Sequence, residues 1–549
     1  TLRVVFTYSL LFMVANFELW VKQQDGWVDA VGSIEESNDN VTITVRDQNG
    51  NQIMEQRESW KLIKVLACGL CATDIASVEG LLPFPFPLVA GHEIIGTQEG
   101  SNQKYAVEIN AAHWSEGDQN IGQCGWCLAT QESESLVSRS TTIVQVSSMH
   151  IHCASRRTIG IDRIIGGTSP FVAVPARNLI SIPTNLPISS DNALLALCEP
   201  MAAAIQAIGV TEFLHEDRVA VLGPRRLGML LLACLIELRR TAENSSALKS
   251  IQIHAIHRRA EILTLCQRLG PDECINISEG VEAKHEDKYQ IVFDCTGTSS
   301  GFETAVRLSN RVVHLKSTCG STSFGCKEWT AFVVDEFSLI PWKSGSPSPL
   351  QSFRFSPSSP YLLDMFPRMK NRKFHILVTP STRKCPQALC DFKDACDAID
   401  SVDFHEMELK EALQFVQSME NPMEEWSSPF PRFDLVLTHS LTEFDSVVRP
   451  TSTSRESPLL SRSPIVVLGE QDPQCGNILQ RKVMSGTLQI RSSRCGHLPN
   501  AISLLGENAS LAHTIKELII SHYAGFHEFP EAIQLASSSA CTKVVLTAP

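Results

Sequence analysis

The feature that most constrains the fold is a buried strand followed at once by an apolar helix, in the segment DRVAVLGPRRLGMLLLACL at 217–235. Val219 to Leu222 predict the strand, and the helix is expected from about Leu227. Further strands are expected in IQIHAI (251–256), IVFDCTG (291–297), VVHLKST (312–318) and AFVVDEFSLI (331–340), with helical segments between several of them. Strands that alternate with helices predict an α/β fold with a doubly wound parallel sheet.

The turn after the first of these strands has the spacing of a nucleotide-binding loop. In such βαβ units, glycines allow a tight turn and let a pyrophosphate approach the helix N-terminus. Gly223 and Gly228 occupy the first and third positions of G-x-G-x-x-G, but Arg225 occupies the second. Either the Arg225 side chain crowds the phosphates, or Arg225 or Arg226 pairs with them. The cofactor-binding candidates are therefore Gly223, Arg225, Arg226 and Gly228.

The end of the next strand bears on the choice of coenzyme. An NAD-preferring enzyme carries an acidic residue there for the ribose hydroxyls. This chain has His257, Arg258 and Arg259 instead. Arginines suit a 2′-phosphate, so Arg258 and Arg259 favour NADP over NAD, and the alternative is an ordinary solvated basic loop.

Metal-ligating residues are concentrated in VLACGLCATDIASVEGLLPFPFPLVAGHEIIG at 65–96. Cys71 is followed by Thr73 and Asp74, and His92 and Glu93 come after a Pro-rich loop. A thiolate, an imidazole and a carboxylate are all good zinc ligands. A hydroxyl close to the thiolate could carry a proton, and a carboxylate behind the imidazole could orient it.

The strings G-L-C-A-T-D and G-H-E-I-I-G resemble the zinc-dependent medium-chain alcohol dehydrogenases, especially the threonine and sorbitol dehydrogenase branch. The resemblance implies a catalytic zinc held by Cys71, His92 and Glu93, with Glu199 of LCEPMAAAIQAI as a direct or water-mediated ligand. It also implies that Thr73 begins a proton relay and that Asp74 positions the ligands. The implied fold is a GroES-like, mostly β catalytic domain joined to a Rossmann domain.

Members of this family often hold a second, structural zinc with four cysteines. Cys124, Cys127 and Cys153 match three of those positions, but Ile121 stands at the first. The last two cysteines are also separated by 26 positions, where the family has about 8. A zinc site here needs a fourth donor, and His152 and His113 are the neighbouring histidines. The alternative is a lobe that binds no metal.

The predicted catalytic domain spans 1–199 and is completed by 521–549. The predicted Rossmann domain spans 200–340 and is completed by 486–520. The reason is that the resemblance to the family's sequence pattern ends at Pro341 and resumes at LQIRSSRCG. The intervening 341–485 is expected to be an insertion with Ser/Pro-rich linkers, since 12 of the 20 residues from 341 to 360 are Ser or Pro. FDLVLTHSLTEFDSVV (433–448) echoes IVFDCTGTSSGFETAV (291–306), which suggests a partial duplication.

Composition limits the class of partner. With 60 acidic and 47 basic residues and a net charge of −13, the chain is a poor candidate for binding nucleic acid. Val4 to Phe17 is apolar but shorter than a membrane span, so a buried first strand is expected rather than a targeting segment. Eighteen cysteines in 549 residues do not indicate a disulfide scaffold, which favours a cytoplasmic location. The resemblance implies a homo-oligomer, either a dimer or a tetramer.

These observations predict an oxidoreductase that uses zinc to transfer a hydride between NADP or NAD and a secondary alcohol, such as a polyol or a sugar. Its partner would be a small alcohol or carbonyl compound. The alternative is a catalytically impaired, dehydrogenase-like binding or regulatory protein, because Arg225 and the missing fourth cysteine depart from the family pattern.

Overall fold

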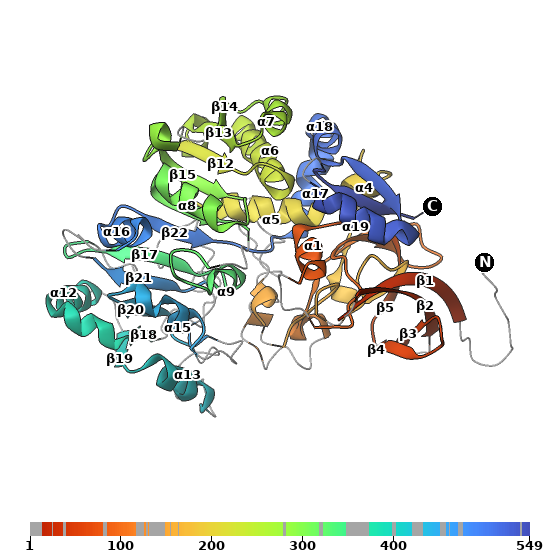
Figure 1. The fold of residues 1–549 in the computed structure, drawn as a ribbon, viewed down its shortest axis with the longest axis horizontal. Coiled ribbons are helices and arrows are strands. Elements are labelled where there is room, and N and C mark those ends of the chain that lie inside the picture. Colours follow the sequence, from red (N-terminus) through yellow and green to blue (C-terminus); the bar gives the residue numbers. More distant parts are fainter. Residues whose placement is uncertain are drawn as a thin grey trace. The chain divides into compact units, whose positions relative to one another are not determined.

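The computed structural model divides the chain into two compact units, which are described separately (Figure 1). The first comprises Thr1–Thr130, Ser148–Ala202 and Cys495–Pro549, and the second comprises Gln131–Ser147 and Ala203–Arg494. The structure describes residues 14–24, 26–36, 40–80, 85–116, 124, 126–127, 130, 149–153, 155–162, 164–277, 282–317, 322–346, 373–397, 402–419, 432–450, 457–459, 462–469, 476–538 and 541–548.

The first unit is built mainly of β-structure. A four-stranded antiparallel meander runs in the order β1-β2-β3-β4, and a second sheet runs β11-β7-β6-β5-β24-β23, with β10 also paired to β5. The strands are β1 (Val14–Gln23), β2 (Gly26–Glu36), β3 (Val41–Asp47), β4 (Gln52–Glu58), β5 (Lys61–Gly69), β6 (Glu93–Thr97), β7 (Lys104–Val107), β10 (Phe171–Val174), β11 (Leu179–Ser181), β23 (His522–Gly525) and β24 (Val544–Thr547), with the short pair β8 (Asn110–Ala111) and β9 (Arg157–Thr158).

Strand β5 is the centre of this unit because it pairs with β6 on one side and with β24 on the other. The C-terminal segment therefore lies beside strands that are more than 400 residues away in sequence. The helices of the unit are α1 (Ala72–Val78), α4 (Asn192–Leu195), α17 (Leu498–Glu507), α18 (Ala509–Ile519) and α19 (Phe529–Ser537), and α5 (Cys198–Gly209) begins in it. Within the described residues, Asn192–Gly209 is long and apolar enough to cross a membrane, but 78% of it is buried, as in a core helix.

The second unit contains one eleven-stranded sheet in the order β14-β13-β12-β15-β16-β22-β17-β21-β20-β18-β19. Its strands are β12 (Arg218–Leu222), β13 (Gln252–His257), β14 (Glu273–Asn276), β15 (Tyr289–Asp294), β16 (Ser309–Leu315), β17 (Ser338–Trp342), β18 (Phe374–Val378), β19 (Val402–Glu406), β20 (Leu435–Thr438), β21 (Pro464–Leu468) and β22 (Gln489–Ser492). Its helices are α6 (Arg226–Thr241), α7 (Ala260–Gln267), α8 (Ser299–Leu308), α9 (Trp329–Val334), α12 (Pro386–Cys396), α13 (Leu409–Gln417), α15 (Phe444–Val448) and α16 (Ile478–Met484).

This sheet consists of two parallel blocks that meet antiparallel, where β17 lies beside β22. In the first block the order is β13-β12-β15-β16. The block's second strand, β13, therefore lies on one side of its first strand, β12, and the later strands β15 and β16 lie on the other side. The second block repeats this arrangement as β19-β18-β20-β21. The last strands are exchanged: β17 follows β16 along the chain but pairs with β21, whereas β22 follows β21 but pairs with β16.

The sequence echo noted above falls at equivalent places in the two blocks. FDLVLT supplies β20, IVFD supplies β15, and each is followed by a helix that packs on the same face of the sheet. Trp329 of α9 joins these helices, with its ring centroid 4.8 Å from that of Phe302 in α8 and 4.3 Å from that of Phe444 in α15. The common topology supports the suggested duplication.

The structure differs from the sequence prediction in three places. AFVVDEFSLI is not one strand, because 329–334 is helical and β17 begins only at Ser338. The segment 341–485, predicted to be an insertion with linkers, does not form a separate unit, because it contributes four neighbouring strands to the same sheet. Residues 495–520 belong to the first unit rather than to the Rossmann part. The predicted strand at Val4 to Phe17 lies largely outside the described residues, and β1 begins at Val14.

Candidate metal centres and nucleotide-binding loop

The first candidate centre begins where β5 leads into α1. Cys71 is the N-cap of α1, and its backbone N–H donates to the Asp74 carboxylate over 2.8 Å. The same carboxylate accepts from the backbone N–H of Gly91 over 3.1 Å. Asp74 therefore ties the two segments that carry the predicted ligands. Burial acts to raise the pKa of Asp74, but His92 and these hydrogen bonds hold it below its ordinary value.

His92 approaches Asp74 from the loop before β6. Its Nδ1 lies 3.3 Å from Asp74 Oδ1, and both side chains are almost fully buried. Gly91 makes this approach possible, because its φ is +95° and a Cβ there would lie 2.8 Å from the Cys68 sulfur and from the Thr168 nitrogen. A carboxylate behind an imidazole fixes the ring's orientation, which is the arrangement expected around a ligating histidine.

Glu93 forms a fully buried ion pair that sequence reasoning missed. Its carboxylate lies 2.5 Å from Lys543 Nζ, and the two side chains are 0% and 3% exposed. Lys543 directly precedes β24, and Glu93 begins β6, so the pair spans β5 between them. Gly69 of β5 leaves room for it, since a Cβ there would lie 2.0 Å from Glu93 Oε2. The sequence hint was the Lys-Val-Val string at 543–545, whose partner no local spacing could identify.

The structure brings together Cys71, His92 and Glu93, whose ligand atoms lie within 4.8 Å of one another. Thr73 is half-buried, with Oγ1 3.8 Å from the Cys71 sulfur. Glu199 is not a member of that group, but the charges of its residues affect the Glu199 carboxyl. Burial raises the pKa of Glu199 to about 7, whereas His92 and Lys543 act to lower this pKa and Glu93 acts to raise it. Cys68, which precedes the motif, is fully buried in the core.

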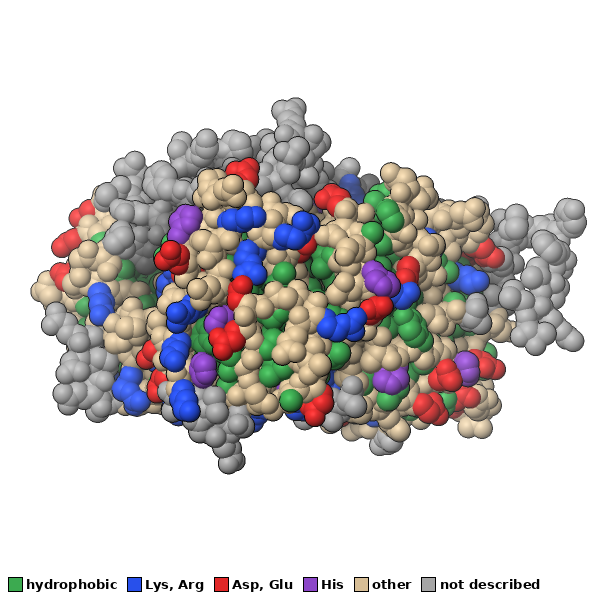
Figure 2. Space-filling model, turned by 90° about the horizontal axis from the view of Figure 1, so that it is seen from above, with side chains coloured by type: hydrophobic (Ala, Val, Ile, Leu, Met, Phe, Trp, Pro, Cys, Tyr) green, Lys and Arg blue, Asp and Glu red, His purple; other side chains and the backbone are tan. Residues whose placement is uncertain are grey.

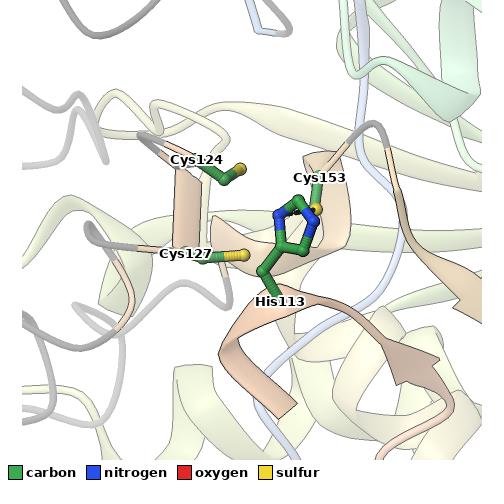
Figure 3. Close-up of side chains that lie close together, drawn as sticks. All are labelled: His113, Cys124, Cys127 and Cys153. Atoms are coloured by element: carbon green, nitrogen blue, oxygen red, sulfur yellow. Dashed lines mark hydrogen bonds between the residues drawn. The ribbon is translucent and has the colours of Figure 1, made fainter. Parts of the chain in front are cut away.

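A second candidate centre lies in the three-cysteine lobe. His113, Cys124, Cys127 and Cys153 have ligand atoms within 4.8 Å of one another, and their side chains point toward a common space (Figure 3). His113 Nδ1 is 3.6 Å from the Cys153 sulfur. Interactions with the Cys124 and Cys127 thiols lower the pKa of Cys153. Three sulfur donors and one imidazole match the donor set of structural zinc sites.

The fourth member of this group answers a question that the sequence left open. His152 is adjacent to Cys153 in the chain, but its ring packs 5.1 Å from that of Trp126. His113 reaches the group from η1 (His113–Glu116), although it precedes Cys124 by 11 positions and matches no family spacing. Ile121, at the family's first cysteine position, lies outside the described residues.

The turn between β12 and α6 is packed tightly around its two glycines. Gly223 has φ +76°, and a Cβ there would lie 2.8 Å from Thr296 Cγ2. A Cβ on Gly228 would lie 2.7 Å from the Gly223 carbonyl oxygen, so the helix approaches the strand end closely. Arg225 is the N-cap of α6 and Arg226 its first residue, and both are half-buried.

Arginines also gather at the end of β13. His257 ends this strand, and its pKa is lowered first by burial and then by the positive charges of Arg259, Arg225 and Arg258. Arg225 follows β12, and Arg258 and Arg259 follow β13, so these residues lie at the carboxyl edge of the first block. In open α/β sheets this edge receives the ligand at the point where the strand order reverses.

The corresponding edge of the second block is built differently. Glu443 Oε2 accepts hydrogen bonds from three hydroxyls, those of Thr379, Ser381 and Thr438, at 2.6–2.7 Å. A carboxylate thus occupies the place between β18 and β20 that corresponds to the space between β12 and β15. Because an anion already accepts these donors, the first block is the better candidate for binding a coenzyme pyrophosphate.

On the face shown in Figure 2, basic and acidic side chains lie interspersed with apolar ones. A mixed surface of this kind is ordinary for globular proteins.

Comparisons with known proteins agree with the geometry of the first unit. Residues 57–184 match the family model described as "Alcohol dehydrogenase GroES-like domain". The chain is similar to an uncharacterized zinc-type alcohol dehydrogenase-like protein of Haemophilus influenzae, at 25% identity over 49% of this chain and 68% of that protein. It is also similar to galactitol 1-phosphate 5-dehydrogenase of Escherichia coli K12, at 22% identity over 45% of this chain and 64% of that protein.

A solved structure of L-idonate 5-dehydrogenase from Escherichia coli is similar at 13% identity and a TM-score of 0.46, covering 97% of this chain and 99% of that one. In the two curated relatives named above, the segment that matches this chain spans about two thirds of the relative's own length. The GroES-like match covers both candidate metal centres, and a doubly wound domain follows it. Residues 57–184 therefore match the GroES-like domain of alcohol dehydrogenases, and the similar curated proteins support a relationship to the zinc-dependent medium-chain alcohol dehydrogenases.

Proposed function

We propose that this protein is a zinc-dependent oxidoreductase that transfers a hydride between a secondary alcohol, such as a polyol or sugar derivative, and NADP. The observation that carries the proposal is the convergence of Cys71, His92 and Glu93, with Asp74 behind the imidazole. A thiolate, an imidazole and a carboxylate fit zinc, which would polarise the substrate oxygen as a Lewis acid. The name of one relative, galactitol 1-phosphate 5-dehydrogenase, indicates a phosphorylated polyol as its substrate, which supports an alcohol as the substrate here.

The chain's own residues supply orientation and proton transfer. Asp74 fixes the His92 ring and the start of α1, so both ligands are placed before a metal arrives. Lys543 balances the charge of the buried Glu93 carboxylate. We assign Thr73 to the first step of the proton relay, because its hydroxyl is the one beside the Cys71 thiol. Glu199 is the candidate for an additional ligand, directly or through water.

The proposed activity is tested by following nicotinamide absorbance with a panel of secondary alcohols and polyols. We expect reduction of NADP that is lost after treatment with a zinc chelator and restored by adding zinc. A protein that binds neither coenzyme and turns over none of the panel would instead be the catalytically impaired binding protein, for which the arginine at position 225 is the favouring observation.

The arginines around His257 predict the preference for coenzyme. Replacing Arg258 and Arg259 together by Ala should weaken NADP binding by about 10- to 100-fold, because a hydrogen bond to a charged group is worth ~1.5–3 kcal/mol. NAD affinity should change little, since NAD has no 2′-phosphate. Calorimetric titration with each coenzyme measures both values.

Helix α7 provides the control for this experiment. Arg268 caps its opposite end and is exposed, so Arg268→Ala removes a positive charge from the same helix without touching the predicted pocket. That variant should bind NADP like the wild type. Equal losses for NADP and NAD in the double variant would contradict the proposed 2′-phosphate pocket.

We also propose that His113, Cys124, Cys127 and Cys153 hold a structural zinc. His113→Ala should remove about one zinc per chain. The loss in zinc affinity should exceed the ~10–100-fold caused by substituting residues that only hydrogen-bond to metal ligands, because His113 is itself a proposed ligand. His152→Ala tests the other histidine and should keep the metal, as should His113→Cys, which restores four cysteines. Metal analysis of the purified variants decides the point. Zinc lost from His152→Ala but kept in His113→Ala would show that the wrong histidine was assigned.

A further inference from the structure

The second block of the sheet carries a cluster of metal-ligating side chains that the proposed reaction does not use. His375 lies on β18, and Asp403 and His405 lie on β19. The parallel register pairs His375 with Asp403 and Leu377 with His405, so the three side chains lie on one face of the sheet. Their ligand atoms lie within 4.8 Å of one another.

We propose that His375, Asp403 and His405 form a binding site for a divalent transition-metal ion, with zinc as the expected occupant. His375 Nδ1 is 3.1 Å from His405 Nε2 and 4.0 Å from Asp403 Oδ2. Two nitrogens that share one tetrahedral zinc, each at 2.0–2.1 Å from it, lie about 3.3 Å apart. The two imidazoles therefore already have the separation that a shared ion requires, and only the carboxylate has to move closer.

The surroundings of the three groups suit a metal. His375 is 3% exposed, whereas the Asp403 side chain is 42% exposed, so the carboxylate can adjust its position and the ion has a path from solvent. Asp403 pairs with Lys373 Nζ at 3.2 Å, but both groups are about half exposed, and such pairs contribute little to stability.

The position of the site indicates what the ion would do. Among the described strands of the sheet, β19 is the edge strand at one end, and it pairs only with β18. Ligands on both strands would let one ion fasten this edge strand to the rest of the block. Three protein ligands also leave a coordination position for water. Because a metal that binds only the folded state stabilises it, zinc should raise the unfolding temperature.

The test compares bound zinc in the full-length wild type, His405→Ala and Asp403→Asn after equilibrium dialysis against zinc. The wild type should hold one more zinc per chain than His405→Ala, whatever the occupancy of the other two centres, because those lie in a different unit. Asp403→Asn should bind this ion at least tenfold more weakly. Its side chain is largely exposed, so this variant should fold even if the half-buried His405 cannot be replaced.

A matched control is available on α18. His513 and Glu517 form an exposed pair 3.1 Å apart. Among the described residues, this pair belongs to none of the three groups of side chains that could hold a metal ion. His513→Ala should leave the zinc content and the zinc-induced rise in unfolding temperature unchanged. Equal zinc content in the wild type, His405→Ala and Asp403→Asn would overturn the proposal, and the contact between His375 and His405 would then be a hydrogen bond only.

Discussion

The Cys71→Ala variant is expected to lose about one zinc per chain and at least about a thousandfold in turnover. The reason is that Lewis-acid polarisation by zinc is worth several kcal/mol, and each 1.36 kcal/mol corresponds to a factor of ten in rate. Cys71 is the thiol at the centre of the proposed site, so its removal leaves an imidazole and a carboxylate that is already paired with Lys543. Metal analysis and steady-state kinetics measure the two losses.

Cys68→Ala is the matched control, because Cys68 lies on β5, three positions before Cys71. Burial raises the pKa of the Cys68 thiol, so it stays neutral, and neutral thiols are poor metal ligands. This variant should keep its zinc and lose some stability, because the sulfur packs against the Gly91 loop. Full activity and zinc content in Cys71→Ala would refute the assignment of the catalytic centre.

The second large effect concerns the buried pair of Glu93 and Lys543. Lys543→Met should destabilise the protein by about 3–5 kcal/mol, because it leaves a carboxylate buried without its counter-charge. Glu93→Gln should be costly for the reciprocal reason. The double variant should recover most of the loss, since neither charge then remains. Urea unfolding of the four proteins, all carrying Cys71→Ala so that zinc cannot compensate, gives the coupling free energy.

An exposed ion pair provides the comparison. Arg383 and Glu406 are 2.7 Å apart with side chains 72% and 46% exposed, so Arg383→Ala should cost less than about 1 kcal/mol. Additive effects of Lys543→Met and Glu93→Gln would mean that the two groups do not stabilise each other. The contrast between the two pairs tests whether burial, rather than distance, sets the cost.

Several features could be predicted from the sequence because neighbouring residues specify them. The strand and helix at 217–235 follow from a run of apolar residues and two glycines, and β12 and α6 form there. Cys71, His92 and Glu93 could be predicted as one group because each lies in a short motif of the family. The helical segment at 329–334 was mistaken for strand because short apolar runs do not distinguish the two structures.

Local patterns in the sequence predict the doubly wound sheet and the candidate donors of the first centre, because both depend on residues within a few tens of positions of one another. The folded chain was needed to show that Lys543 pairs with Glu93, that His113 rather than His152 lies beside the three cysteines, and that β17 and β22 exchange blocks. These choices depend on strands and loops that meet from distant parts of the chain. Hydrophobic burial and strand pairing bring such segments together, and no spacing along the sequence records which ones will meet.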